Sequence, residues 1–127
     1  MLLGAGDYPI TIAEMPSYSS EADQYFDVEE HERLKEFLAI NPEIGRMLPD
    51  TGGVRLLQWP IKQSAKIPAA RILYYFRDLN MPIYLLALYK RGERIQLDGR
   101  WRRELKRLVE QLLAEHGRRW ATMLFDR

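Results

Sequence analysis

Four stretches of the chain carry the apolar pattern of β-strands. Residues 9–15 show a short alternation, and residues 54–59, 69–77 and 83–89 are apolar runs bounded by glycine, proline or aspartate, as strands commonly are. In the last two runs both alternating sets of side chains are apolar. We therefore expect these two strands at the centre of a sheet that is covered on both faces.

Apolar residues at helical spacing predict a helix after residue 27. Asp27 is its expected cap, with Glu30 completing a capping box three residues later. The pair Asn41-Pro42 should end it, because proline disfavours the helical conformation of the preceding residue. Residues 17–23 read either as a polar connection or as a short first helix.

A second helix is expected over residues 98–116, where apolar residues recur every three or four positions. Gly117 is expected to end this helix, since glycine is common just past a helix terminus. Residues 118–127 would then form a short tail. Residues 43–49 are expected to be a turn of helix that runs into a loop.

The order strand, helix, three strands, helix predicts one α+β domain over residues 1–127. Its sheet should be four-stranded and mostly antiparallel, and it should pack against the N-terminal helix or helices and the C-terminal helix. A length of 127 residues with 46% hydrophobic content suffices for one core and is too short for two.

The composition argues against several classes of site. The chain has no cysteine, which excludes a disulfide framework, thiol catalysis and cysteine-held zinc. His31 and His116 are far apart in sequence, and neither a metal site nor a cofactor is predicted. No apolar run approaches the roughly 18 residues of a membrane span, and residues 1–9 lack the features of a secretory signal. We expect a cytoplasmic protein with no membrane partner.

The net charge of +1 hides a division along the chain. Residues 1–50 hold eleven Asp or Glu and three Lys or Arg, a net charge of −8. Residues 51–127 hold sixteen Lys or Arg and seven Asp or Glu, a net charge of +9. This division indicates either an anionic partner for the second part or attraction between the two parts after folding.

The positions of the cations favour the anionic partner. Arg55, Arg71, Arg77 and Lys90 each lie at or near the end of a predicted strand. A small sheet with cations along one edge is a suitable surface for a phosphate backbone.

Five features taken in order resemble a known family. They are residues 41–45 (NPEIG), residues 50–55 (DTGGVR), Lys66, residues 71–76 (RILYYF), and residues 84–93 with their Tyr-Leu-Leu, Tyr-Lys and Glu. This order and spacing resembles the RelE superfamily of bacterial toxins, in its HigB-like, phage-associated branch. The likeness extends from about residue 10 to about residue 116.

The resemblance implies a small antiparallel sheet packed against helices and a type II toxin neutralised by a cognate antitoxin. Many members of this family cut mRNA on the ribosome without a metal, by activating the ribose 2′-hydroxyl against the adjacent phosphate. The antitoxin expected for this branch is a helix-turn-helix protein. A second copy of the chain is a further candidate partner.

With the resemblance, five cations become candidates for this chemistry, which needs a base, a stabiliser of the charged phosphorane and an acid. Lys66 is the candidate base, acting through a lowered pKa. Arg55 and Arg71 are the candidate phosphate clamps, because the guanidinium fork engages two phosphate oxygens. Lys90 or Arg91 is the candidate acid or stabiliser.

Three further residues are candidates for binding RNA. Tyr74 or Tyr89 could stack on a base or donate a proton, and Lys62 lies in the same polar loop as Lys66.

The sequence departs from the family pattern at two places. Leu56 and Gln58 stand where this branch usually has cations, and residues 66–70 hold proline and alanine where a glycine-rich loop is common. These departures leave a second interpretation, a protein that binds RNA, ribosome or antitoxin without cleavage. A third is a topoisomerase inhibitor like the related ParE branch, against which the HigB-like motifs argue.

Overall fold

The computed structural model describes residues 10–61 and 69–125, with side chains up to residue 119. This part of the chain forms three helices and a five-stranded mixed sheet, which confirms the predicted α+β class. The elements in order are β1 (Ile12–Glu14), α1 (Pro16–Tyr25), α2 (Val28–Ile40), β2 (Arg46–Met47), β3 (Val54–Pro60), β4 (Ala69–Tyr75), β5 (Ile83–Lys90) and α3 (Gly99–Phe125).

The sheet has the strand order β1-β5-β4-β3-β2. The pairs β2–β3, β3–β4 and β4–β5 are antiparallel, whereas β1 runs parallel to β5, with Ile12 opposite Ile83. The prediction of four strands was wrong by one. The added strand β2 has only two residues, inside a segment expected to be a turn of helix and a loop.

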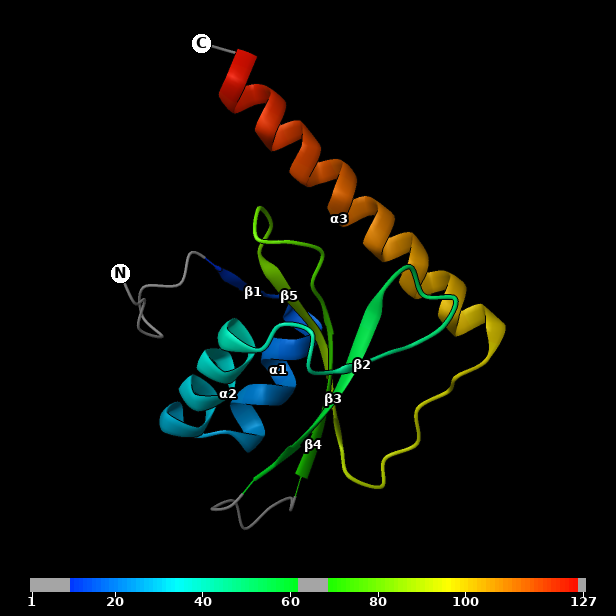
Figure 1. Ribbon diagram of the computed structural model, residues 1–127. Helices are drawn as coiled ribbons and strands as arrows, with labels where there is room; N and C mark the ends of the chain where they lie inside the picture. Colours follow the sequence, from blue (N-terminus) through cyan, green and yellow to red (C-terminus); the bar gives the residue numbers. More distant parts are fainter. Residues whose placement is uncertain (1–9, 62–68, 126–127) are drawn as a thin grey trace.

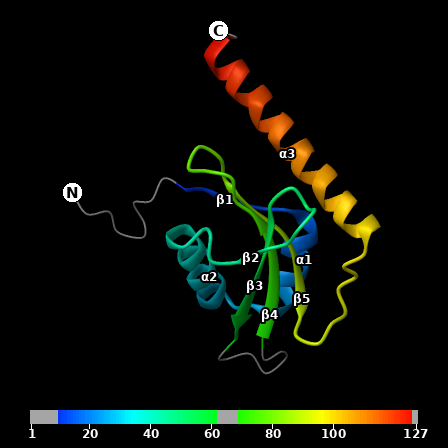
Figure 2. The same cartoon turned by 45° about the vertical axis from the view of Figure 1, so that its right-hand side comes forward.

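The two central strands are apolar on both faces, as predicted, and each face has its own helical cover (Figures 1 and 2). Helices α1 and α2 cover one face, here called the α1/α2 face, and α3 covers part of the other, the α3 face. On the α1/α2 face, Leu34 and Leu38 pack with Ile72 in one cluster. On the α3 face, Leu73 packs with Val109 in a second cluster.

The start of α2 follows the sequence prediction. The Glu30 N–H donates to Asp27 Oδ1 at 2.7 Å, so Asp27 caps the helix. The Glu30 carboxylate is nearly buried, and it accepts from the indole N–H of Trp59 at 3.2 Å and from the guanidinium of Arg33. The preceding segment, left open between connection and helix, is the helix α1.

The end of α3 was predicted wrongly, because the helix continues through Gly117 to Phe125 and takes in most of the expected tail. Glycine lowers helix stability by about 1 kcal/mol relative to alanine, which is too little to end a long helix. Beyond Leu112, the last buried residue described on it, α3 projects past the sheet (Figure 1). In the described part of the chain, no helix is long and apolar enough to cross a membrane.

Candidate phosphate-binding cavity

The strand register separates the predicted cations onto two faces of the sheet. Between β3 and β4, Arg55 lies opposite Tyr74 and Gln58 lies opposite Arg71. Tyr74 belongs to the core of the α1/α2 face, so Arg55 lies on that face as well. Gln58 and Arg71 lie on the α3 face, in line with Leu56 and Leu73. Arg55 and Arg71 therefore do not clamp one phosphate together.

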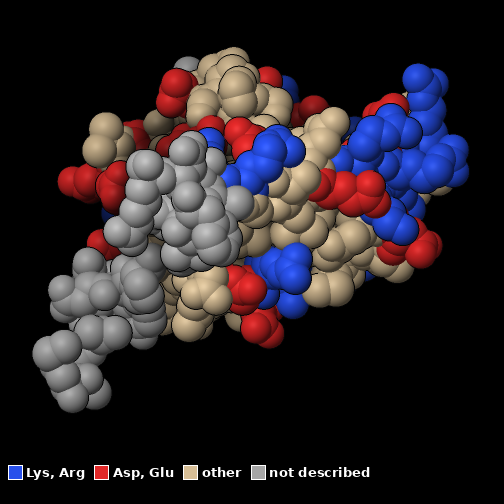
Figure 3. Space-filling model, turned by 90° about the horizontal axis from the view of Figure 1, so that it is seen from above, with Lys and Arg blue, Asp and Glu red and all other residues tan. Residues whose placement is uncertain are grey.

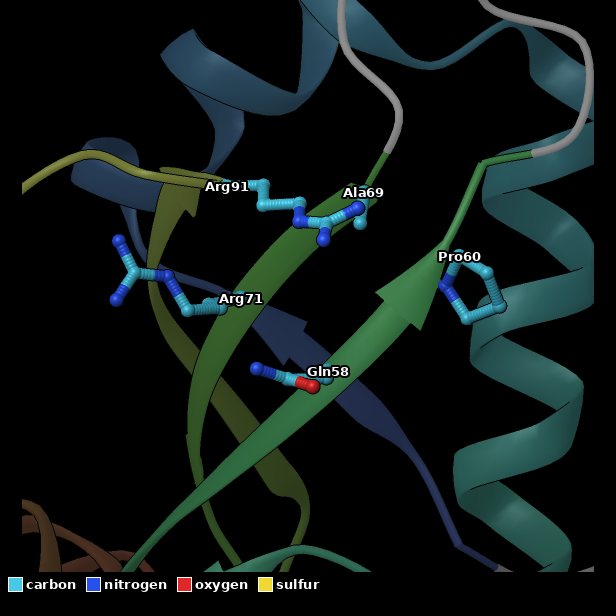
Figure 4. Close-up of a pocket in the computed structure, with 5 residues that line it drawn as sticks. All are labelled: Gln58, Pro60, Ala69, Arg71 and Arg91. Atoms are coloured by element: carbon cyan, nitrogen blue, oxygen red, sulfur yellow. The ribbon is translucent and has the colours of Figure 1, made fainter.

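A cavity of about 430 Å³ opens on the α3 face, at the end of the sheet that α3 leaves uncovered (Figure 4). Its described lining is Gln58, Pro60, Ala69, Arg71 and Arg91. Two guanidinium groups and one amide thus share a concave surface to which no described carboxylate contributes. A surface of this kind attracts an anion.

Arg71 uses part of its guanidinium to hold the turn that follows β5. Its Nη2 donates to the carbonyl oxygen of Lys90 at 3.0 Å and to that of Glu93. The turn is closed by the Glu93 N–H bond to Lys90 O at 3.0 Å, and Gly92 supplies its positive φ of 87°. Both bonds of the Arg71 guanidinium use Nη2, and Nη1 has no hydrogen bond to another described residue. The guanidinium therefore retains a donor group for a ligand while it fixes the turn that carries Arg91.

Arg91 presents an uncommitted guanidinium at the cavity. Its backbone N–H donates to Ala69 O at 3.1 Å, which fixes the start of the side chain. The exposed side chain reaches across the beginning of β4 beside Ala69 (Figure 4). Within residues 10–61 and 69–119 this guanidinium has no hydrogen bond or ion pair. It is the group most available to an incoming anion.

Of the two residues predicted as acid or stabiliser, Lys90 lies on the other face of the sheet from Arg71. Its Nζ is 5.9 Å from the centroid of the Tyr25 ring, a residue of α1. Adjacent residues of a strand point to opposite faces, and Arg91 therefore occupies the cavity where Lys90 does not.

Arg55 holds the loop between α2 and β2. Its Nη1 donates to Glu43 O at 2.9 Å and to Gly45 O at 2.8 Å. Arg55 therefore stabilises a loop on the α1/α2 face, and the structure does not bring the two predicted clamps together.

Tyr74 holds the same loop from within the core. Its hydroxyl accepts from the Gly45 N–H at 2.8 Å and donates to Pro42 O at 2.9 Å. The side chain is fully buried, and burial raises the pKa of its phenol. A ring with no exposed surface cannot stack on a nucleobase, so this predicted role for Tyr74 does not fit the structure.

Tyr89 lies directly opposite Arg71 across β4 and β5, on the α3 face. Its ring is partly buried and packs in the same cluster as Trp101, at the start of α3. Burial raises the pKa of this phenol, so the group stays protonated at neutral pH and can donate. Sequence reasoning placed Trp101 in the apolar stripe of the last helix and missed this contact, which depends on the fold.

Lys62 and Lys66 lie outside the described residues. In the sequence they stand between Pro60 and Ala69, which both line the cavity. Gln58, noted in the sequence only as a departure from the family pattern, is a further residue of the lining.

The histidine in the described N-terminal part is partly buried against the core of the α1/α2 face. His31 Nε2 lies 3.1 Å from the Tyr18 hydroxyl, and its ring stacks on Phe26 at 5.6 Å between centroids. In residues 10–61 and 69–119 no group of three or more His, Asp or Glu side chains is arranged to hold a metal ion. No known protein-family model matches this chain.

Proposed function

We propose that this protein is a RelE-type toxin that binds mRNA at the cavity and cleaves it on the ribosome, under the control of a helix-turn-helix antitoxin. The observation that supports this proposal best is the pair Arg71 and Arg91 lining one cavity to which no described acid contributes. Guanidinium groups form paired, charge-assisted hydrogen bonds to phosphate oxygens. A phosphodiester held between them would have its developing negative charge stabilised.

The remaining roles in the proposal follow from the chemistry of the step. Lys66 is the proposed base that takes the proton of the ribose 2′-hydroxyl, and Lys62 is a proposed backbone contact. Tyr89, opposite Arg71 across β4 and β5, is the proposed proton donor, because burial raises the pKa of its phenol and keeps it protonated. The 2′-oxygen would attack the phosphorus, the bond to the 5′-oxygen would break, and that oxygen would take up a proton.

A second candidate function is RNA binding without cleavage. It is favoured by one observation: the described lining residues Gln58, Pro60, Ala69, Arg71 and Arg91 include no group that exchanges a proton near neutral pH. Under this alternative the cavity holds a phosphate, and no base acts on it.

The variant Arg91→Gln tests the proposal with little risk to the fold, because this exposed guanidinium has no partner among the described residues. Loss of a charge-assisted contact of about 1.5–3 kcal/mol should weaken RNA binding about 10- to 100-fold. On induced expression in bacteria, the parent should stop translation and produce new mRNA 5′ ends in codon register. The variant should neither stop translation nor produce these new 5′ ends.

Arg46→Gln is the matched control, since Arg46 is exposed on β2, outside the cavity, and its loss changes the net charge equally. Both variants should give the far-ultraviolet circular dichroism of the parent. Full toxicity of Arg91→Gln would refute the assigned site. RNA binding by the parent without new 5′ ends would support the non-cleaving candidate, and a DNA damage response would instead indicate a topoisomerase inhibitor.

A further inference from the structure

The charge division of the sequence becomes a division between the two sides of the sheet. The acidic first part of the chain supplies α1 and α2, and the basic second part supplies α3. Among the described residues, every ion pair joins partners within residues 1–50 or within residues 51–127. The two parts therefore do not neutralise each other through direct pairs, and the basic side remains available to an anion.

Lys and Arg side chains gather over the first turns of α3, on the right of Figure 3. Two of the arginines there have partners. Arg102 donates to the carbonyl oxygens of Leu97 at 2.9 Å and Pro49 at 2.5 Å, and Arg100 pairs with Glu104 at 3.3 Å.

Three other cations of these turns are exposed and have no hydrogen bond or ion pair in the described part of the chain: Arg103, Lys106 and Arg107. We call them the α3 basic cluster.

The α3 basic cluster is not explained by the stability of the helix. Arg103 lies three residues from Lys106 and four from Arg107, and like charges at these spacings repel each other along a helix. The N-terminus of α3 already has an anion, because the Asp98 carboxylate accepts from the Trp101 N–H at 2.9 Å. The repulsion among the three cations is what an external anion would relieve.

We propose that the α3 basic cluster is a second RNA contact, which binds the phosphate backbone independently of sequence. This inference rests on the proposal that the cavity takes RNA. The cluster and the cavity belong to the same side of the sheet, and residues 91–98 connect them along the chain with exposed cations at Arg91 and Arg94. An RNA longer than the cavity can therefore meet both surfaces.

The test uses the full chain, the double variant Arg103→Gln/Arg107→Gln and the charge-matched control Arg46→Gln/Arg77→Gln. Binding is measured with 2′-O-methyl RNA, which cannot be cut by 2′-oxygen attack, in lengths of about 6 and about 30 nucleotides. Affinity for the long RNA is measured over a series of salt concentrations, because each phosphate contact to a single strand contributes about 0.7 to the salt slope.

The α3 double variant should bind the long RNA about 10-fold more weakly, and its salt slope should be smaller by about 1.4, the value for two lost phosphate contacts. It should bind the short RNA like the parent, and the control should change neither affinity. Equal salt slopes for the α3 double variant and the control would overturn the inference. The inference would also be overturned if the α3 double variant lost binding to phosphatidylserine vesicles and kept the RNA affinity of the parent. That result would assign the surface to a membrane.

The two proposals fail separately in this design. If Arg91→Gln leaves short-RNA binding and toxicity unchanged, the cavity assignment is refuted. A loss of long-RNA binding by the α3 double variant would still stand as evidence for the basic cluster.

Discussion

The phenol of Tyr74 should contribute to stability through the loop it holds and should contribute nothing to RNA binding. Tyr74→Phe removes the oxygen that accepts from the Gly45 N–H at 2.8 Å and donates to Pro42 O at 2.9 Å. The Gly45 N–H is buried, and a buried donor left without a partner costs about 1–3 kcal/mol. The carbonyl oxygen of Pro42 is only partly buried and can accept a hydrogen bond from water instead. We expect Tyr74→Phe to lower the free energy of unfolding by about 2 kcal/mol.

The assay is urea unfolding followed by circular dichroism, in which a change of midpoint at constant slope reports stability. Tyr84→Phe is the matched control, since this partly buried tyrosine of β5 has no hydrogen bond in the described part of the chain. It should change the free energy of unfolding by less than about 0.5 kcal/mol. The short 2′-O-methyl RNA should bind Tyr74→Phe with the affinity of the parent.

Two results would refute this reasoning. If Tyr74→Phe and Tyr84→Phe were equally stable, the two hydrogen bonds of Tyr74 would not hold the loop. If Tyr74→Phe kept its stability and lost RNA binding, the phenol would act on the ligand and the assignment of the faces would be wrong.

Three further predictions concern the stability of the fold. Gly45→Ala should lower the free energy of unfolding by about 1–3 kcal/mol, because a Cβ there would lie 2.7 Å from Cε1 of Tyr74. In the same urea assay Gly117→Ala should be neutral or stabilising, since a Cβ at Gly117 meets nothing within 4 Å. Burial lowers the pKa of His31, so the unfolded chain takes up a proton more readily, and stability should fall as the pH drops through the unfolded value of about 6.5. His31→Gln should reduce this loss between pH 8 and pH 5, and an unchanged pH profile would refute the prediction.

Much of the fold could be predicted from local sequence alone. Asp27 caps α2, and the strands β3, β4 and β5 coincide with apolar runs, since each depends on residues close in sequence. The features that were missed are of two kinds. One is a strand too short to show a hydrophobic period, and the other is a pairing between segments that are distant in sequence. The two residues of β2 carry no alternation, and the parallel pairing of β1 with β5 joins segments about seventy residues apart.

The end of α3 shows a limit of the same kind. Glycine after an apolar stripe predicts a helix terminus, yet Gly117 lies within the helix with the ordinary negative φ of an α-helix. A terminal glycine usually takes a positive φ, and this conformation is not encoded in the residue type. Sequence could indicate where α3 leaves the core, after Leu112, but not where the helix itself stops.

The assignment of cations to the cavity depended on one irregularity in β5. Ile83 and Leu85 face α1 and α2, and simple alternation from them would place residue 90 on the α3 face beside Arg71. The register between β4 and β5 shifts at Leu73 and Tyr74, where Leu86 is the extra residue of a bulge. After it, Leu88 again faces the α1/α2 core. A single inserted residue therefore turns Lys90 away from the cavity and turns Arg91 toward it.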